Sequence, residues 1–115
     1  MHRLLPALLL VACADTDTDT DGVDPCDDLP AVTWGNWAEG FFTTYCTSCH
    51  SGSTPDRRGA PEGMDFDTHE QVWGLRPAIR QAVLVDETMP LGGGMHDEDR
   101  ELLGVWLDCG LAPAD

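Results

Sequence analysis

The segment Cys46-Thr47-Ser48-Cys49-His50 constrains this chain more than any other part of it. Side chains three positions apart lie on one face of a helical turn, so the two thiols point the same way and the imidazole follows at once. Thiols and imidazoles hold metal ions, cofactors and disulfide partners. The rest of the fold therefore has to be built around whatever these three groups hold.

Several kinds of chemistry use such a segment. A dithiol redox pair expects a βαβ pattern, but the residues around Cys46 are helical and aromatic. Structural zinc expects a second pair of ligands, which His69 and His96 do not form. A plain disulfide suits an exported protein and leaves His50 unexplained. Covalent haem uses all three groups, because each cysteine adds to a vinyl group and the histidine binds the iron. The sequence favours haem c on Cys46 and Cys49 with His50 as proximal ligand, and zinc or simple thiol chemistry remains the alternative.

Apolar residues recur at helical spacing on both sides of this segment. A helix running into Cys46 presents one face made of Trp37, Phe41, Phe42 and Tyr45. Thr33 or Asn36 can cap its start. A C-terminal helix begins with Asp97-Glu98-Asp99 and ends before Gly110. Its apolar face consists of Leu102, Leu103, Trp106 and Leu107. The spacing of the apolar residues predicts that each helix buries one face against a common core.

Two shorter helices are predicted between them. Thr68-His69-Glu70-Gln71 is typical of a capping box and opens a helix through Trp73. Pro77 suits the first position of another helix, through about Leu84. Apolar and polar residues show no convincing alternation of period two, so we expect an all-α domain from about Ala31 to Leu111.

This layout resembles a small class I cytochrome c over nearly the whole domain. That family has an N-terminal helix, a CxxCH segment, a haem-wrapping middle, a distal Met loop and a C-terminal helix that crosses the first. Phe42 and Trp106 match the aromatic residues of the two crossing helices, and Ala38 stands where the family often has glycine. The resemblance implies a class I cytochrome c-like helical fold wrapped around one covalently attached haem.

The resemblance also implies a distal iron ligand. Met89-Pro90 matches the Met-Pro pattern of the family, and the glycines at 92–94 let the chain turn back toward the last helix. We therefore expect Met89 to bind the iron opposite His50, with Met95 as the second candidate and Met64 as a packing residue. The arginines Arg57, Arg58, Arg76 and Arg80 either reach the haem propionates or are solvated, and none is predicted as a site residue.

The first twelve residues predict a signal peptide, with the cationic start Met1-His2-Arg3 before an apolar run from Leu4 to Val11. Its end, Leu10-Val11-Ala12-Cys13, resembles a bacterial lipobox, which implies cleavage before Cys13 and diacylation of its sulfur. The alternative is an ordinary signal peptide with a chance cysteine. The resemblance implies the periplasmic side of the bacterial cell envelope, and Ala14 weakly favours the outer membrane.

Residues 13–30 predict an acidic, flexible tether that carries the acylated cysteine, because alternating Asp and Thr bury no apolar surface and like charges extend the chain. Asp17, Asp19 and Asp21 also fit the start of a calcium loop, but flanking helices and a bidentate Glu are missing. The haem domain is expected at 31–111 and a short tail at 112–115.

Cysteine parity then suggests a disulfide. With Cys13 assigned to lipid and Cys46 and Cys49 to haem, Cys26 and Cys109 are left over, one on each flank of the domain. An oxidising envelope favours their pairing, and two free thiols are the alternative. Crossing helices, as in the family, give the two flanks a reason to meet.

The net charge of the chain limits the kinds of molecule that it can bind. The formal net charge is -15, and all six Lys and Arg residues are arginines. This balance argues against nucleic acid as a partner, because phosphates repel carboxylates. No run approaches the ~20 apolar residues that span a bilayer, so we expect membrane contact through the lipid anchor only.

The predicted function is an extracytoplasmic electron carrier that cycles haem iron between Fe(III) and Fe(II) for redox protein partners, without acting as an enzyme. Many members of the family dock through lysines, which this chain lacks, so the partner surface should be basic or apolar. The alternatives are a haem sensor or haem enzyme subunit with an open or labile sixth position, and a structural envelope lipoprotein without haem.

Overall fold

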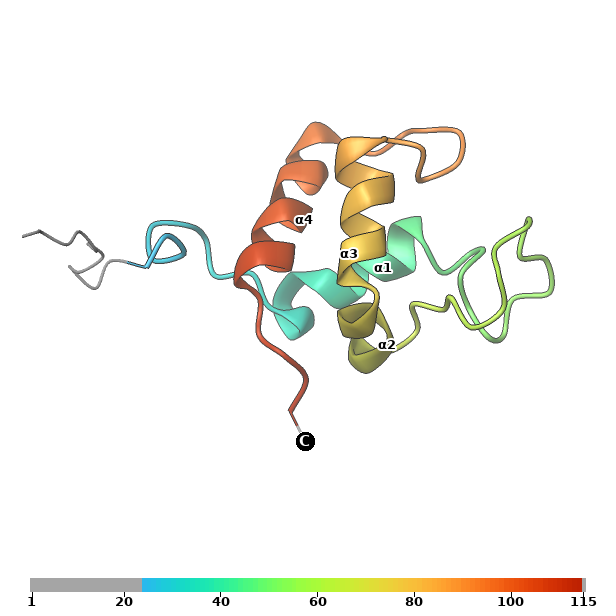
Figure 1. Ribbon diagram of the computed structural model, residues 1–115, viewed down its shortest axis with the longest axis horizontal. Helices are drawn as coiled ribbons and strands as arrows, with labels where there is room; N and C mark the ends of the chain where they lie inside the picture. Colours follow the sequence, from blue (N-terminus) through green and yellow to red (C-terminus); the bar gives the residue numbers. More distant parts are fainter. Residues whose placement is uncertain (1–23, 115) are drawn as a thin grey trace, which may run out of the picture.

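Regular structure in the computed structural model is entirely helical over residues 24–114, the part of the chain that the structure describes (Figure 1). The predicted signal peptide, Cys13 and most of the tether lie outside these residues. The helical segments are η2 (Trp34–Ala38), α1 (Glu39–Tyr45), α2 (His69–Gly74), α3 (Arg76–Ile79), η3 (Arg80–Val85) and α4 (Asp97–Cys109). The all-α prediction is confirmed for the described residues.

The N-terminal helix consists of η2, a π-helical turn, followed directly by α1. Thr33 and Asn36 both take part in its cap: the backbone N–H of Asn36 donates to Thr33 Oγ1 at 3.0 Å, and that of Thr33 donates to Asn36 Oδ1 at 2.8 Å. This reciprocal pair satisfies two N–H groups that the first turn leaves without partners. The helix ends with Cys46 as its C-cap residue, so it delivers the chain to the CxxCH segment as predicted.

The middle helices follow the predicted signals to within a residue or two. Thr68 and Gln71 form the capping box of α2, with the N–H of Gln71 donating to Thr68 Oγ1 at 3.2 Å. Pro77 lies in the first turn of α3, where its missing N–H has no intrahelical partner to lose. The helix continues through η3 as far as Val85.

The last helix, α4, begins with the three predicted acidic residues and ends one residue before Gly110. Gly110 ends the helix as its C-cap residue, as expected, and a close approach explains why the residue is glycine. Its φ is -69°, which any residue adopts. A Cβ atom there would lie 2.6 Å from the carbonyl oxygen of Trp106 and 2.8 Å from its ring. Only glycine leaves Trp106 room to pack.

Aromatic side chains join the N-terminal helix to α4 in the core. Phe42 of α1 and Trp106 of α4 meet edge to face, with ring centroids 5.8 Å apart. Around Trp106 lies an aromatic cluster, defined here as Trp34, His69, Trp73 and Trp106. His69 is the first residue of α2. Its ring stacks on Trp34 at 4.9 Å with an interplanar angle of 2°.

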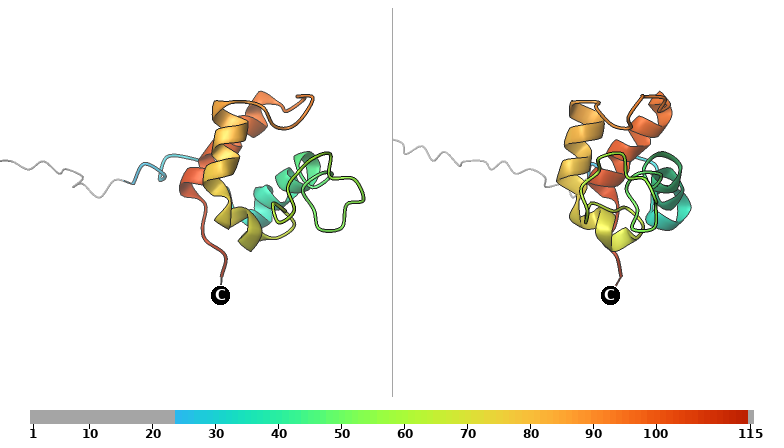
Figure 2. Two further views of the ribbon diagram at one scale, coloured as in Figure 1. Left: turned by 45° about the vertical axis from the view of Figure 1, so that its right-hand side comes forward. Right: turned by 90° about the vertical axis from the view of Figure 1, so that its right-hand side faces the viewer.

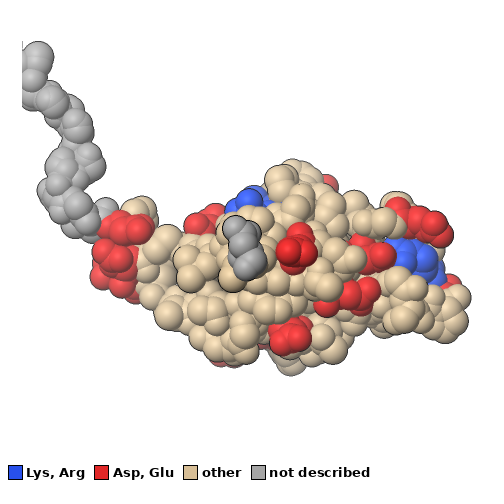
Figure 3. All heavy atoms as spheres, turned by 90° about the horizontal axis from the view of Figure 1, so that it is seen from below, with Lys and Arg blue, Asp and Glu red and all other residues tan. Residues whose placement is uncertain are grey.

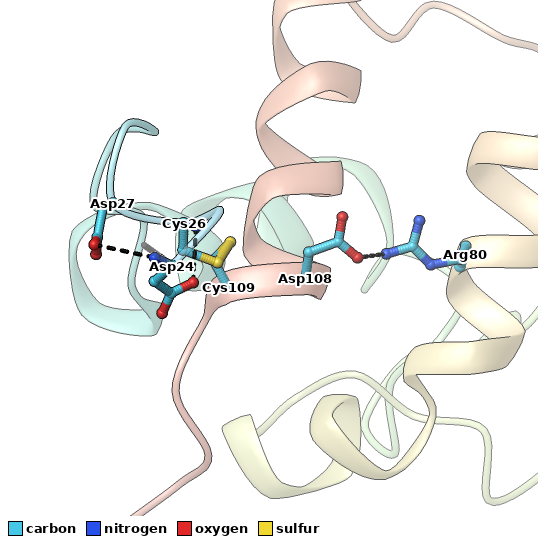
Figure 4. The surroundings of a disulfide bond; sticks show 6 residues. All are labelled: Asp24, Cys26, Asp27, Arg80, Asp108 and Cys109. Carbon is cyan, nitrogen blue, oxygen red and sulfur yellow. Dashed lines mark hydrogen bonds and ion pairs between the residues drawn. A yellow bond between two sulfur atoms is a disulfide. The ribbon is translucent and has the colours of Figure 1, made fainter. Parts of the chain in front are cut away.

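The structure contains the predicted disulfide between Cys26 and Cys109, with Cα atoms 5.8 Å apart (Figure 4). Cys109 is the last residue of α4, so the bridge fixes the segment before η2 to the end of the last helix. Beside it, Arg80 of η3 forms an ion pair with Asp108 of α4. The two flanks of the domain therefore meet as expected for crossing helices.

Two loops extend from the opposite end of the domain. Residues 51–67 and 87–95 carry no helix, and both lie on the side away from residues 24–30 (Figures 1 and 2). The molecule thus has a bridged end that holds the disulfide and a looped end that holds the CxxCH segment.

Candidate functional site

A cavity of about 620 Å³ opens at the looped end. Its volume is within the range of about 300–1,000 Å³ that is typical of small-molecule and cofactor sites. One wall comes from the CxxCH segment and the 51–67 loop, and the other from α3, η3 and the 87–95 loop. All four predicted haem-holding residues line this one cavity: Cys46, Cys49, His50 and Met89.

Backbone hydrogen bonds fold the CxxCH segment into a single turn. The carbonyl of Cys46 accepts from the N–H of Cys49 at 3.2 Å and from the N–H of His50 at 2.9 Å. The N–H of Cys46 still donates to Phe42 of α1, at 2.9 Å. The helix therefore sets the direction of this turn, and the turn brings both thiols and the imidazole to the same cavity.

The two thiols of the segment are unpaired. Burial raises the pKa of the Cys46 thiol to about 12, since removal from water disfavours the thiolate. Dithiol redox centres do the opposite and lower the pKa of the attacking cysteine. Cys46 therefore lacks the electrostatic setting of a thioredoxin-like nucleophile, which weakens that alternative.

His50 is held in a defined tautomer. Its Nδ1 lies 2.9 Å from the carbonyl oxygen of Met64, and because a carbonyl can only accept, Nδ1 carries the proton and donates. The other ring nitrogen, Nε2, is then the one with a free lone pair in the neutral imidazole. The ring also stacks on Phe66, at 4.6 Å and 17°. A histidine oriented by a backbone carbonyl in this way is prepared to bind a metal.

The opposite wall carries the methionine loop. Both Thr88 and Met89 donate their N–H groups to the carbonyl of Ala82, at 2.8 and 3.2 Å, which fixes the start of the loop to η3. The glycines at 92–94 follow with φ values of 81°, 75° and 93°. Residues with a side chain rarely adopt these left-handed backbone angles, so the run of glycines permits the turn that returns the chain to α4.

The three methionines near the cavity are placed differently. Met89 is half-buried and lines the cavity. Met95 is 9% exposed and belongs to the packed core, although it also lines the cavity. Met64 lies on the wall of His50, because its own carbonyl receives the Nδ1 proton. Met89 and Met95 are thus the candidates for a ligand opposite His50, as the sequence suggested.

Two site residues were not predicted from the sequence. Tyr45 lines the cavity and donates its hydroxyl to Asp99 Oδ2 of α4 at 2.6 Å; this hydrogen bond is the main cause of a raised pKa for Tyr45. The partners are 54 residues apart, so no local pattern marks them. Arg57 is the second, because it extends into the 51–67 loop and is not a solvated surface arginine.

The cavity is less acidic than the molecule around it. Its charged lining residues are Asp56, Arg57 and Arg58, although the whole chain has 21 Asp and Glu against six Arg. On the face drawn in Figure 3, acidic side chains are scattered along the body and basic ones gather in a few places. A partner that approaches the cavity therefore meets a surface of nearly balanced charge.

No family model, no curated protein and no solved structure matches this chain. Between residues 24 and 114, none of the helices has both the length and the apolar character needed to cross a bilayer. The same residues hold no group of three or more His, Cys, Asp and Glu side chains that could bind a metal ion.

Proposed function

We propose that this protein is an extracytoplasmic electron carrier with a class I cytochrome c-like fold, in which Cys46 and Cys49 hold one haem covalently and His50 binds its iron. The observation that carries the proposal is the convergence of these residues and Met89 on one cavity. These side chains come from segments separated by 39 positions, 50 to 89, and they meet only in the folded chain.

The residues present fit this group in three respects. The cavity has cofactor size. The imidazole of His50 has its Nδ1 proton engaged, which leaves Nε2 for a metal. The side chains that line the interior include Phe66, Ile79 and Val83, which are apolar and buried. When bound, haem supplies one-electron exchange between Fe(III) and Fe(II).

The residues of the chain then have separate tasks. Cys46 and Cys49 fix the position of the group and prevent its loss. His50 and Met89 would both bind the iron, and two protein ligands would exclude exogenous ligands and favour electron transfer over catalysis. The thioether of Met89 is a soft donor that favours the reduced metal, so it raises the reduction potential relative to a second histidine.

The charge of the protein indicates the kind of redox partner, and the N-terminal sequence indicates the cellular location. An acidic body with a nearly neutral cavity mouth suits a redox partner whose docking surface is basic or apolar. Lipidation of Cys13, which lies outside the described residues, would place the domain on the periplasmic side of the cell envelope, with the outer membrane weakly favoured.

The test is expression of the full chain with a c-type maturation system. We expect haem that stays with the polypeptide in acid-acetone and on denaturing gels, and we expect Cys46→Ala/Cys49→Ala to abolish it. If no haem attaches to the natural chain, the carrier proposal fails and a structural lipoprotein takes its place.

Axial ligation distinguishes a carrier from a sensor. The natural protein should be low-spin in both redox states and bind carbon monoxide poorly. Met89→Ala should open the site to carbon monoxide and lower the potential, and the matched variant Met95→Ala should do neither. A high-spin natural protein that binds carbon monoxide readily would indicate the sensor or enzyme-subunit function.

A further inference from the structure

We infer that Arg57 is a positioning residue for His50. It holds the 51–67 loop, which orients the imidazole of His50, and it thereby raises the reduction potential of the site. The inference rests on the proposed function for its effect on potential. The neighbouring Arg58 does not share this task.

The Arg57 guanidinium makes four hydrogen bonds and one ion pair, and all five partners lie inside this one loop. Nε donates to Ala60 O at 3.1 Å, Nη1 to Ser51 O at 2.7 Å, and Nη2 to Pro61 O at 2.6 Å. Two weaker contacts complete the set: Nη2 to Met64 O at 3.4 Å, and an ion pair from Nη1 to Asp65 Oδ1 at 2.7 Å that lacks hydrogen-bond geometry. With four of its five N–H groups in hydrogen bonds to the loop, Arg57 is held by the loop and not directed at a ligand in the cavity.

The loop depends on these contacts because it has no regular structure of its own. Carbonyl groups in a helix or strand find partners in a regular ladder, but residues 51–66 form only isolated turn bonds, from Thr54 N to Ser51 O, Ala60 N to Arg57 O and Met64 N to Pro61 O. One short backbone bond, from Phe66 N to His50 O at 2.8 Å, closes the two ends of the loop. The interior of the loop is held by Arg57, whose side chain is only 20% exposed.

The connection to His50 runs through Met64. Its carbonyl accepts the Nδ1 proton of His50, and the same oxygen faces Nη2 of Arg57. A cation at that oxygen withdraws electron density, so the carbonyl becomes a weaker acceptor and the imidazole acquires less imidazolate character. Less negative charge on an iron ligand favours the reduced metal. The positive charge of Arg57 acts in the same direction, because it opposes the extra charge of the oxidised iron.

Arg58 provides a matched control. It also lines the cavity, carries the same charge and stands one residue further along. Its side chain is exposed, and the only hydrogen bond described for it is from its backbone N–H to Asp56 Oδ1, at 2.9 Å. A charge in water at this position is screened, so its removal should matter little.

The experiment compares Arg57→Gln, Arg57→Lys and Arg58→Gln in the full chain purified with its haem. Redox titration gives the midpoint potential, and amide hydrogen exchange reports on the bonded N–H groups of Ala60, Met64 and Phe66. We expect Arg57→Gln to lower the equilibrium constant for reduction about tenfold, or about 59 mV for one electron. Exchange at the three amides should accelerate together. Arg58→Gln should leave both measurements close to those of the natural chain.

Arg57→Lys separates charge from geometry and serves if Arg57→Gln does not fold. Lysine keeps the charge but cannot reproduce the planar fork, so we expect fast exchange and most of the loss in potential. Equal potentials for Arg57→Gln and Arg58→Gln, or unchanged exchange in both Arg57 variants, would overturn the inference. If the natural chain attaches no haem, the carrier proposal fails, and the effect on potential fails with it. The exchange comparison then decides only whether Arg57 holds the loop.

Discussion

The two ends of this domain are packed in different ways. At the bridged end, side chains fill the space themselves: Trp106 and Val72 are fully buried, and the other rings of the aromatic cluster pack around Trp106. At the looped end, residues that are only half-buried, such as Cys46, Met64 and Met89, line a cavity. Stability should therefore come mainly from the bridged end, and binding from the looped end.

The composition of the segments explains the contrast. Helices η2, α1, α2 and α4 supply four tryptophans and two phenylalanines to the bridged end and the helix crossing. The 51–67 and 87–95 segments are rich in glycine and proline, which supply turns and little apolar surface. A chain of this size has a thin core, and here its apolar side chains are concentrated at one end.

The largest effect should come from Trp106→Ala. Loss of a fully buried tryptophan removes transfer energy and leaves a cavity in the aromatic cluster, at a cost of about 3–5 kcal/mol in the free energy of unfolding. Urea unfolding measures this, with Trp37→Ala as control because Trp37 is only half-buried. Equal losses for the two variants would contradict the view that full burial in the aromatic cluster carries this stability.

Removal of the disulfide should have the next largest effect. Cys26→Ser/Cys109→Ser opens a closed loop with a sequence separation of 83, and we expect a loss of about 2–4 kcal/mol because the unfolded chain regains entropy. Thermal unfolding with and without reductant gives the same comparison in the natural protein. If the protein holds the proposed haem, the haem absorption spectrum of the folded variant should match that of the natural protein, because the bridge is far from the cavity. A changed spectrum would show that the two ends are coupled.

A small, pH-dependent effect is expected at Asp67, where the 51–67 loop ends. The N–H of Gly52 donates to its carboxylate at 2.9 Å, and this bond, with help from Ser51 and from the charge of Arg57, lowers the pKa of Asp67. A lowered pKa in the folded state stabilises the protein above the ordinary carboxyl pKa, and that contribution disappears as the pH falls through the lowered value.

Asp67→Asn should therefore unfold more easily than the natural protein near neutral pH, and the difference should shrink toward pH 3. Chemical unfolding at several pH values measures it, with Glu62→Gln as control for an exposed carboxylate in the same loop. A difference that stays constant with pH would mean that the carboxylate charge contributes nothing.

The sequence predicted those features that local chemistry determines. Capping residues mark Thr33 and Thr68, acidic residues mark the start of α4, and the spacing of Cys46, Cys49 and His50 marks the site. Contacts between distant segments leave no such pattern. The stacking of His69 on Trp34 depends on how α2 meets η2. The contacts of Arg57 depend on the path of a loop without regular structure. Gly110 was predicted correctly but for another reason, since only the fold brings Trp106 against it.

The bridge between Cys26 and Cys109 also determines how mechanical load passes through the molecule. Tension applied between the two ends of the chain would pass from Cys26 through the disulfide to Cys109, and η2 and α1 lie outside this covalent path. A covalent bond bears such a load without extension, so the helix that leads into the CxxCH segment is shielded from it. A domain pulled at its two ends would thus keep the geometry of its cavity until the disulfide is reduced.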